Sequence, residues 1–237
     1  MKMLILAGGF GSRLQPVVAT TPKAMAPVGT IPFLYLQIQN WIDQGLRTFV
    51  FLLHHQADQI ISFLEAEKFG LLKACKVEWL IESTPMDTGG AVANAVHQLN
   101  LTGDFLVTNA DTWIGSGVQE VAQSAVPSIA VLRLQDASRY GLVKFDDKFL
   151  VTGFSEKSVE KGSCWISAGL CHLHVDLFKD WDGQPFSLER VCLSALARCG
   201  ALKAVALQTD FIDIGIPDDY FRFCQWIAAN RKGNLCS

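Results

Sequence analysis

The sequence lacks a dominant charge of one sign. Across 237 residues, 20 lysines and arginines oppose 23 aspartates and glutamates, which leaves a formal net charge of −3. Such a chain has no overall basic field for holding nucleic acid or an anionic membrane by bulk electrostatics. We expect no nucleic-acid partner, and any anionic ligand must be met by a few local groups.

Long hydrophobic runs are also missing. The longest apolar segments, such as TFVFLL and AVPSIAVL, are far shorter than the roughly 20 residues of a membrane-spanning helix. The N-terminal MKMLILAGG ends its apolar run in glycines, before it reaches the about 7–15 residues of a signal-peptide core. We therefore expect a cytoplasmic protein that is neither secreted nor bound to a membrane.

Cysteine patterns typical of zinc sites or disulfide frameworks do not occur. The seven cysteines are odd in number, and none belongs to a Cys-x-x-Cys pair or has a nearby histidine at a zinc-binding spacing. The pairs Cys164/Cys171 and Cys192/Cys199 are interpreted as buried thiols in a reducing compartment.

Half of the residues are hydrophobic, enough for one full core. Short β-like runs such as KMLILAG (2–8) and TFVFLLHH (48–55) alternate with longer amphipathic segments such as PFLYLQIQNWIDQG (32–45). This order predicts an α/β fold with a mixed, mostly parallel sheet flanked by helices. We expect a single domain over residues 1–237.

The pattern changes from about Arg139. The segment YGLVKFDDKFLVTGFSEK (140–157) has short alternating strands around an Asp-Asp turn, which predicts a small antiparallel insertion forming one wall of a cleft. FSLERVCLSALARCG (186–200) predicts a helix. A last helix is expected from about Pro217, because acidic residues in its first turn favour the positive helix end.

A glycine-rich loop follows the first strand, in LILAGGFGSRLQP (4–16). Gly8, Gly9 and Gly11 allow several backbone N–H groups to turn toward one anion, with a helix beginning behind them. The spacing fits neither the dinucleotide nor the P-loop fingerprint. On glycines alone, a tight turn explains the pattern as well as a phosphate cradle.

Two cations accompany this loop. Arg13 lies within it, where a planar guanidinium can bind two phosphate oxygens, and Lys23 follows in TPKAMAPV (21–28). As an isolated pair they would be interpreted as solvated surface charges. The whole pattern, however, resembles the signature of the sugar-1-phosphate nucleotidyltransferases, also called NDP-sugar pyrophosphorylases.

The resemblance extends over essentially the whole chain. ESTPMDTGGAVANAV (82–96), VTNADTWI (107–114) and FIDIGIPDDY (211–220) are similar to the nucleobase segment, the metal strand and the closing segment of this family. Within it, the chain is most similar to the D-glycero-D-manno-heptose 1-phosphate guanylyltransferases. The resemblance implies a Rossmann-like nucleotide-diphospho-sugar transferase fold.

The implied reaction joins an NTP, with GTP the expected donor, to a sugar 1-phosphate and releases pyrophosphate. An activated heptose for a surface polysaccharide is the expected product. Charge neutralisation and positioning are the main tasks in phosphoryl transfer. Asp111 and Asp213 each follow an apolar strand and match the family's metal positions, so they are expected to hold Mg²⁺.

The resemblance also implies roles for the remaining site residues. Arg13, with backbone groups of Gly8, Gly9, Gly11 and Ser12, is expected to hold the departing phosphates, and Lys23 to reach the point of transfer. Lys157 is expected on the incoming sugar phosphate. The expected sugar-side residues are Asn109, Tyr140, Gly141, Glu156 and Ser167.

The expected nucleobase site comprises Leu6, Ala7, Gly8, Glu82, Thr88, Gly89 and Gly90. A carboxylate at Glu82 can accept from two guanine donors, although an exposed strand-end charge remains an alternative. Ser167 stands where the family usually has asparagine, which leaves the acceptor sugar open.

Several alternatives stay open at this point. Uridylyl-, thymidylyl- or mannose-1-phosphate guanylyltransferases share the pattern, and a non-catalytic relative would retain the fold. A nicotinamide dehydrogenase needs a different glycine spacing. The histidines His54, His55, His172 and His174 are expected to be structural or exposed, and the protein to be a monomer or homodimer.

Overall fold

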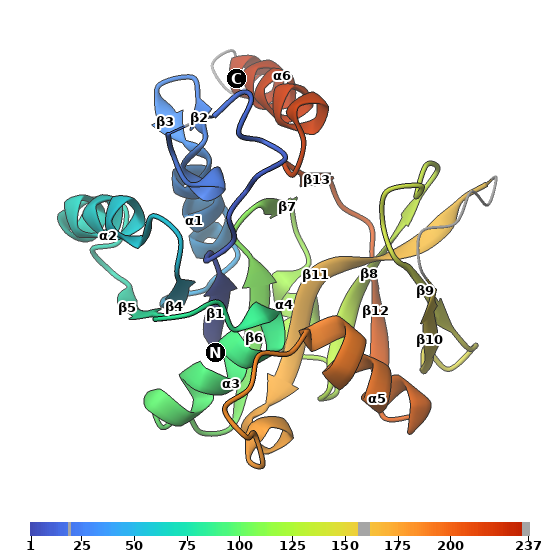
Figure 1. Ribbon diagram of the computed structural model, residues 1–237. Helices are drawn as coiled ribbons and strands as arrows, with labels where there is room; N and C mark the ends of the chain where they lie inside the picture. The colour runs from blue at the N-terminus through green and yellow to red at the C-terminus, as the bar shows by residue number, and fades with distance from the viewer. Residues whose placement is uncertain (19, 156–161, 234–237) are drawn as a thin grey trace.

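The computed structural model describes residues 1–18, 20–155 and 162–233 (Figure 1). The strands are β1 (Lys2–Leu6), β2 (Pro27–Val28), β3 (Ile31–Pro32), β4 (Thr48–Leu53), β5 (Lys76–Ile81), β6 (Asp104–Asn109), β7 (Thr112–Ile114), β8 (Ser128–Leu134), β9 (Leu142–Phe145), β10 (Val151–Ser155), β11 (Cys164–His174), β12 (Lys203–Leu207) and β13 (Phe211–Asp213). The α-helices are α1 (Phe33–Asp43), α2 (Ala57–Ala66), α3 (Asp87–Gln98), α4 (Val118–Ala122), α5 (Ser194–Arg198) and α6 (Pro217–Gly233). Shorter helical segments are the 3-10 turns η1 (Lys23–Met25), η2 (Glu67–Phe69) and η3 (Val175–Phe178) and the π-helix η4 (Leu188–Leu193).

A nine-stranded mixed sheet organises the chain. Its strands follow the order β10-β9-β11-β6-β1-β4-β5, and β8 pairs with β11 and β12. Strands β5, β4, β1 and β6 run parallel, whereas β11 is antiparallel to β6. Because β1 is central in the parallel part, the loop that follows it leaves the sheet at the edge where β4 and β6 also end. The predicted fold class is confirmed.

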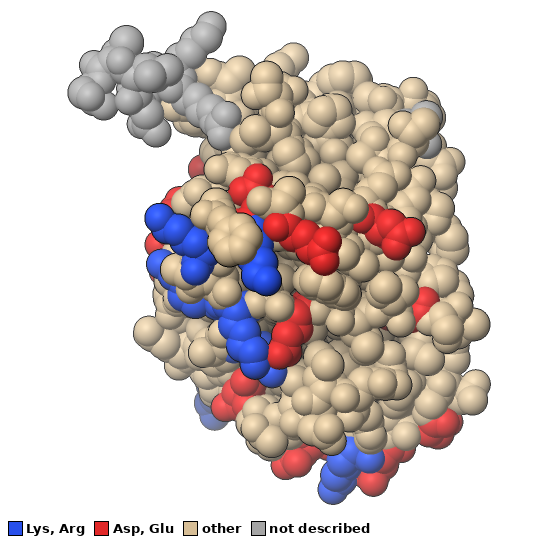
Figure 2. Space-filling view, turned by 90° about the vertical axis from the view of Figure 1, so that its left-hand side faces the viewer, with Lys and Arg blue, Asp and Glu red and all other residues tan. Residues whose placement is uncertain are grey.

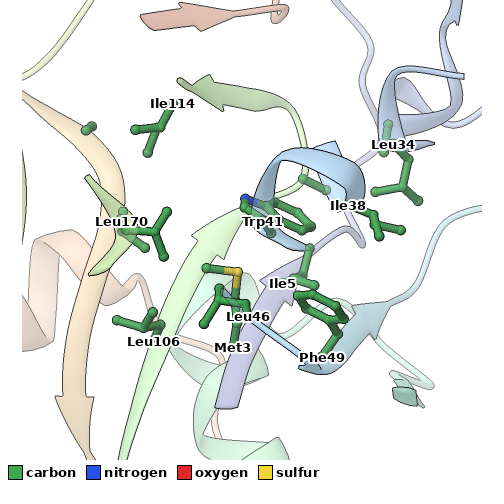
Figure 3. Packing of buried hydrophobic residues seen from close by; sticks show 14 of the residues in the cluster. Met3, Ile5, Leu34, Ile38, Trp41, Leu46, Phe49, Leu106, Ile114 and Leu170 are labelled. Atoms are coloured by element: carbon green, nitrogen blue, oxygen red, sulfur yellow. The ribbon is translucent and has the colours of Figure 1, made fainter. Parts of the chain in front are cut away.

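Side-chain alternation along the strands produces a three-layer architecture. Met3 and Ile5 of β1 belong to one buried cluster, together with apolar residues of α1, α2 and α4. Leu4 faces the opposite side, where a second cluster includes residues of α3, η4 and α5. Figure 3 shows the first cluster, in which Trp41 and Ile38 of α1 lie over β1. Helices therefore cover both faces of the sheet.

The antiparallel insertion expected after Arg139 is present as the β9–β10 hairpin. β9 joins the main sheet through its pairing with β11 at Ile166↔Leu142. β11 itself has an irregularity between Ser167 and Cys171, and Gly169 within it has a φ of +72°. The bulge redirects the strand beside the hairpin, at the wall of the cleft described below.

A third buried cluster joins the N-terminal loop to the C-terminal helix. Leu14, Phe33, Ile212 and Phe223 are among its buried members, and α6 lies above β7 and β13 in Figure 1. The last helix begins at Pro217, as expected. Packing of α6 against the loop fixes the loop near the sheet edge.

Some local expectations were wrong. No helix begins directly behind the glycine loop in the described residues, since turns occupy that segment and the first helical turn is η1. The expected helix of residues 186–200 starts as π-helix η4 before α5. The cysteines in the described part of the chain are free thiols, but Cys171 is buried whereas Cys199 is exposed.

The surface reflects the balanced composition. Figure 2 shows lysine and arginine side chains lying next to acidic ones on the face that carries α2 and β5. Among the described helices, none is both long and apolar enough to cross a membrane.

Candidate functional site

The principal cavity lies where the parallel strands β1, β4 and β6 end. It has a volume of about 620 Å³, and it occupies the edge of an open α/β sheet where ligands generally bind. Most of the predicted nucleotide, phosphate and metal residues border it: Leu6, Ala7, Gly8, Gly9, Gly11, Ser12, Arg13, Lys23, Glu82, Thr88, Asp111 and Asp213. The predicted sugar-side residue Asn109 borders it as well. The fold thus brings together segments from the N-terminus, the middle and the C-terminus of the chain.

The glycine loop is fitted closely against its neighbours. A Cβ atom at Gly8 would lie 3.1 Å from the Cβ of His54, and one at Gly11 would lie 3.1 Å from the Cβ of Lys23. Gly11 also has a φ of +60°, a conformation that favours glycine. These glycines let the loop cross the ends of β4 and η1 at short range, so its backbone borders the cavity together with Arg13.

Three charged groups meet on the cavity floor. The Nζ of Lys23 donates to the Asp111 carboxylate and lies 3.6 Å from Oδ1 of Asp213. The Lys23 side chain is only 14% exposed, whereas the two carboxylates are about 30% exposed. Lys23 therefore neutralises both acids where they open into the cavity.

A short two-stranded sheet brings the two aspartates together. β7 pairs with β13 so that Thr112 and Asp213 lie opposite each other, and the Ile214 N–H donates to the Asp111 carbonyl oxygen at 3.0 Å. The buried Gln37 of α1 donates to the Thr112 carbonyl oxygen at 2.6 Å. Backbone pairing therefore fixes the relative position of the acids independently of any ion.

The pKa of the Asp213 carboxyl is shifted by its surroundings. Burial and the neighbouring negative charge of Asp111 raise the pKa of this carboxyl, and Lys23, the Gly215 N–H and Arg13 partly offset that rise. The Gly215 N–H donates to Asp213 Oδ1 at 2.8 Å. Two carboxylates that repel each other in a half-buried site are a donor set suited to a divalent cation.

The residues present fit Mg²⁺, which takes one or two protein carboxylates and keeps several waters. Asp111 and Asp213 would hold it. In the described residues no cluster of three or more His, Cys, Asp or Glu side chains forms a denser site, and the fit therefore rests on these two oxygen donors.

The opposite end of the cavity carries the expected base-binding residues. Glu82 follows β5, is half-buried and accepts from the Met86 N–H at 3.2 Å. Burial raises the pKa of its carboxyl. His54 Nδ1 lies 2.9 Å from the Glu82 carbonyl oxygen, and its side chain also borders the cavity.

Gly89 and Gly90 have contacts that differ from the expected ones. Their N–H groups donate to the Phe186 carbonyl oxygen, and a Cβ at Gly89 would lie 2.2 Å from the Phe186 ring. They are absent from the cavity lining, although Thr88 borders it. In the structure these glycines allow α3 to pack closely against the segment before η4.

A second cavity of about 460 Å³ adjoins the first. Asn109, Thr112 and Asp213 border both cavities. Of the predicted sugar-side residues, Asn109, Tyr140, Gly141 and Ser167 border the second one. Glu156 and Lys157 lie outside the described residues. The two cavities therefore meet at Asn109, Thr112 and Asp213.

Sequence reasoning missed several residues of these cavities. In the second cavity they are Thr112, Arg139, Phe154, Ser155, Ala168, Gly169, Glu189, Arg190, Ser194 and Phe211. Arg139 directly precedes Tyr140, but it stands in a polar loop with no pattern of its own. His54 at the end of a parallel strand could have been proposed as a cavity residue from its position alone.

Comparisons with known proteins show the family of this chain. Residues 2–229 match the family described as nucleotidyl transferase. A D-glycero-alpha-D-manno-heptose 1-phosphate guanylyltransferase of Campylobacter jejuni is 30% identical over 94% of this chain and 98% of its own. The crystal structure of HddC from Yersinia pseudotuberculosis complexed with GMP-PN is 32% identical, with a TM-score of 0.84 over 95% of this chain and 99% of that one.

Longer relatives match as well. The catalytic subunit beta of a mannose-1-phosphate guanylyltransferase from Drosophila pseudoobscura pseudoobscura is 28% identical over 98% of this chain, which spans 64% of that protein. The fold agrees with the family match, and the chain belongs to the nucleotidyl transferase family.

Proposed function

We propose that this protein transfers GMP from GTP to a sugar 1-phosphate, with D-glycero-α-D-manno-heptose 1-phosphate as the favoured acceptor, and releases pyrophosphate. The observation that carries the proposal is the meeting of two cavities at Asp213, beside Asp111 and Lys23. The first cavity, of about 620 Å³, suits a nucleoside triphosphate, and the second, of about 460 Å³, suits a smaller polar acceptor. The heptose guanylyltransferase relative of nearly the same length supports the choice of substrates.

In the proposed reaction, an oxygen of the acceptor phosphate attacks the α-phosphorus of GTP. The new O–P bond forms as the bond to the β-phosphate oxygen breaks, and pyrophosphate leaves in line. Arg13 and the loop N–H groups bind the departing phosphates, and Lys23 binds oxygens at the point of transfer. When bound by Asp111 and Asp213, Mg²⁺ would supply further neutralisation of phosphate charge.

The acceptor is bound by the second cavity in this proposal. Tyr140, Gly141 and Ser167 form its wall, and Asn109 lies at the junction with the nucleotide. Glu156 is assigned to sugar hydroxyls and Lys157 to the acceptor phosphate from the sequence pattern alone. The proposal takes residues 1–237 as one catalytic domain that works as a monomer or homodimer in the cytoplasm and contributes to polysaccharide synthesis.

Guanine selection is assigned to Glu82. Its half-buried carboxylate borders the nucleotide cavity, and an ionised carboxylate accepts from the N1–H and 2-amino groups of guanine. The relative crystallised with GMP-PN supports a guanine nucleotide. Uridine and thymidine nucleotides lack this pair of adjacent donors.

A panel of nucleotides and acceptors tests the proposal. Purified protein with Mg²⁺ is incubated with GTP, ATP, UTP or dTTP and with heptose 1-phosphate, mannose 1-phosphate or glucose 1-phosphate, and pyrophosphate release is measured. The highest kcat/KM is expected for GTP with the heptose. Asp213→Asn is the negative control. Preference for mannose 1-phosphate would assign the activity named for the longer relatives, and release without GTP preference would refute the guanine assignment.

A further inference from the structure

Arg139 occupies the acceptor cavity and is tied to the C-terminal helix. Its Nη2 donates to the Asp219 carboxylate and to the Tyr140 hydroxyl at 3.3 Å. The guanidinium carbon lies 5.5 Å from the centroid of the Tyr140 ring, within the range of a cation–π contact. Three contacts from two different segments therefore hold the guanidinium over the cavity wall.

Asp219 is a buried acid that binds arginine side chains. Its side chain is 8% exposed, and it lies in the first turn of α6. Besides Arg139 it accepts from Arg222 Nη2 at 3.0 Å. One buried carboxylate faces two guanidinium groups. Of the two arginines, Arg139 borders the acceptor cavity.

The corner is connected to the point where the cavities meet. The Tyr140 ring packs edge-on against Phe211, with 5.6 Å between the ring centroids. Phe211 opens β13, which ends at Asp213, and α6 with Asp219 follows after a short turn. A single C-terminal segment therefore places one acid beside Asp111 and another beneath Arg139, on one side of the acceptor cavity.

Arg139 has the chemistry needed for an anionic acceptor. Both of its described hydrogen bonds leave from Nη2, and a guanidinium carries two further nitrogens with N–H donors. Arginine held in one orientation loses little entropy when it binds phosphate oxygens in a bidentate manner. Asp213 and Glu189 border the same cavity, and Arg139 and Arg190 are the cations on its described wall. Arg190 lies 3.5 Å from the Asp87 carboxylate, so Arg139 would act on the phosphate together with Lys157.

We propose that Arg139, oriented by Asp219 and Tyr140, binds the phosphate-bearing end of the acceptor and so determines acceptor affinity. The inference rests on the proposed function, because it takes the second cavity as the sugar 1-phosphate site. Arg139 acts on the acceptor directly, whereas Asp219 is a positioning residue. In this proposal, Arg139 takes no part in binding the nucleotide.

Steady-state kinetics of four variants test the inference. Arg139→Gln is expected to raise the KM for the sugar 1-phosphate about 10- to 100-fold, the cost of one charged hydrogen-bonding group, with the KM for GTP changed less than about twofold. Arg139→Lys retains charge without the planar fork, so it should fall between wild type and Arg139→Gln. Asp219→Asn should raise the acceptor KM in the same direction.

Arg222→Gln is the matched control. It removes the other guanidinium from the same carboxylate, and Arg222 is not among the residues that border the acceptor cavity. The KM of Arg222→Gln for the acceptor is expected to equal that of wild type. Equal effects of Arg139→Gln and Arg222→Gln, or a parallel rise in both substrates' KM, would show a structural role only and overturn the inference.

Equilibrium binding separates this inference from the proposed reaction. Calorimetric titration of wild type and Arg139→Gln with mannose 1-phosphate and heptose 1-phosphate reports acceptor binding without turnover, and circular dichroism confirms folding. Binding to wild type that weakens in Arg139→Gln supports the inference even if no pyrophosphate is released, which would refute only the proposed reaction. Unchanged binding in the variant refutes the role of Arg139, and no binding to wild type refutes both.

Discussion

Replacing Lys23 by methionine tests the electrostatics of the paired aspartates. The substitution keeps an unbranched chain of similar length but removes the charge that lies 3.6 Å from Asp213 and bonds to Asp111. Two half-buried carboxylates are then left facing each other without the cation that bonds to Asp111, and only the more remote charge of Arg13 still acts on Asp213. We expect lower stability of the metal-free protein at pH 7 and a stronger stabilisation by added Mg²⁺.

The size of the effect follows from Coulomb's law. At 3.6 Å, a pair of unit charges interacts by about 1 kcal/mol in water and about 5 kcal/mol at an effective dielectric constant of 20. Because the aspartate side chains are about 30% exposed, the lower part of this range applies. A loss of about 1–2 kcal/mol corresponds to roughly 2–8 °C in Tm for a chain of this size.

The assay is thermal unfolding with and without Mg²⁺, followed by turnover. Lys76→Met is the matched control, since Lys76 has an ion pair of 2.9 Å with Glu78 but is 67% exposed, and such surface pairs contribute little. In Lys23→Met the Mg²⁺-induced rise in Tm should exceed that of wild type, while kcat/KM falls by about 10²–10³. Equal Tm values for the two variants, with the same response to Mg²⁺, would refute the reasoning.

Four further predictions concern Gly215, Glu82 and Asp213. Gly215→Ala would place a Cβ 2.9 Å from Asp213 Oδ1 and 3.1 Å from Lys23 Nζ. Because this displaces both groups, pyrophosphate release should fall about 10- to 100-fold. Gly153→Ala is the control: its Cβ meets no atom within 4 Å, so its rate of pyrophosphate release should match that of wild type. Burial raises the pKa of Glu82, so the folded protein binds this proton more tightly than the unfolded chain and loses that stability as pH rises through the raised pKa. Urea unfolding should show Glu82→Gln gaining stability relative to wild type as the pH rises above the usual carboxyl range, and a pH-independent difference would contradict this. Glu82→Gln should also narrow the preference for GTP over ATP in the same panel of nucleotides, and an unchanged preference would remove Glu82 from base selection. Asp213→Asn should abolish the Mg²⁺-induced rise in Tm, and a rise equal to that of wild type would place the ion elsewhere.

The local order of the site was predictable because it depends on short-range constraints. A strand followed by Gly8, Gly9 and Gly11 can do little other than turn sharply, and the apolar alternation of β1 fixes which residues face each layer. The tertiary contacts of the glycine loop were harder to predict from the sequence. That Gly11 lies against Lys23, and Gly8 against His54, depends on how η1 and β4 return to the loop.

The π-helix and the glycines of α3 illustrate what a sequence pattern hides. Thr88, Gly89 and Gly90 stand in a motif that indicates nucleotide contact, yet two of the three are used to dock the Phe186 segment. Helical periodicity of residues 186–200 was correct in outline, but a one-residue widening of the hydrogen-bond pattern in η4 is a tertiary effect. Short-range sequence patterns encode neither the contact with Phe186 nor the π-helical hydrogen bonds of η4.

By itself, the sequence determined the α/β layering, the glycine loop and the family membership, because hydrophobic period, glycine placement and motif spacing act over a few residues. The family resemblance predicted that Asp111 and Asp213 share one metal site, but only the tertiary structure shows the pairing of β7 with β13 that brings them together. The tertiary structure also decided that Arg139 faces the acceptor cavity, through a buried carboxylate on α6. Both contacts join segments that are distant along the chain. Only the folded backbone sets the distance between the side chains involved.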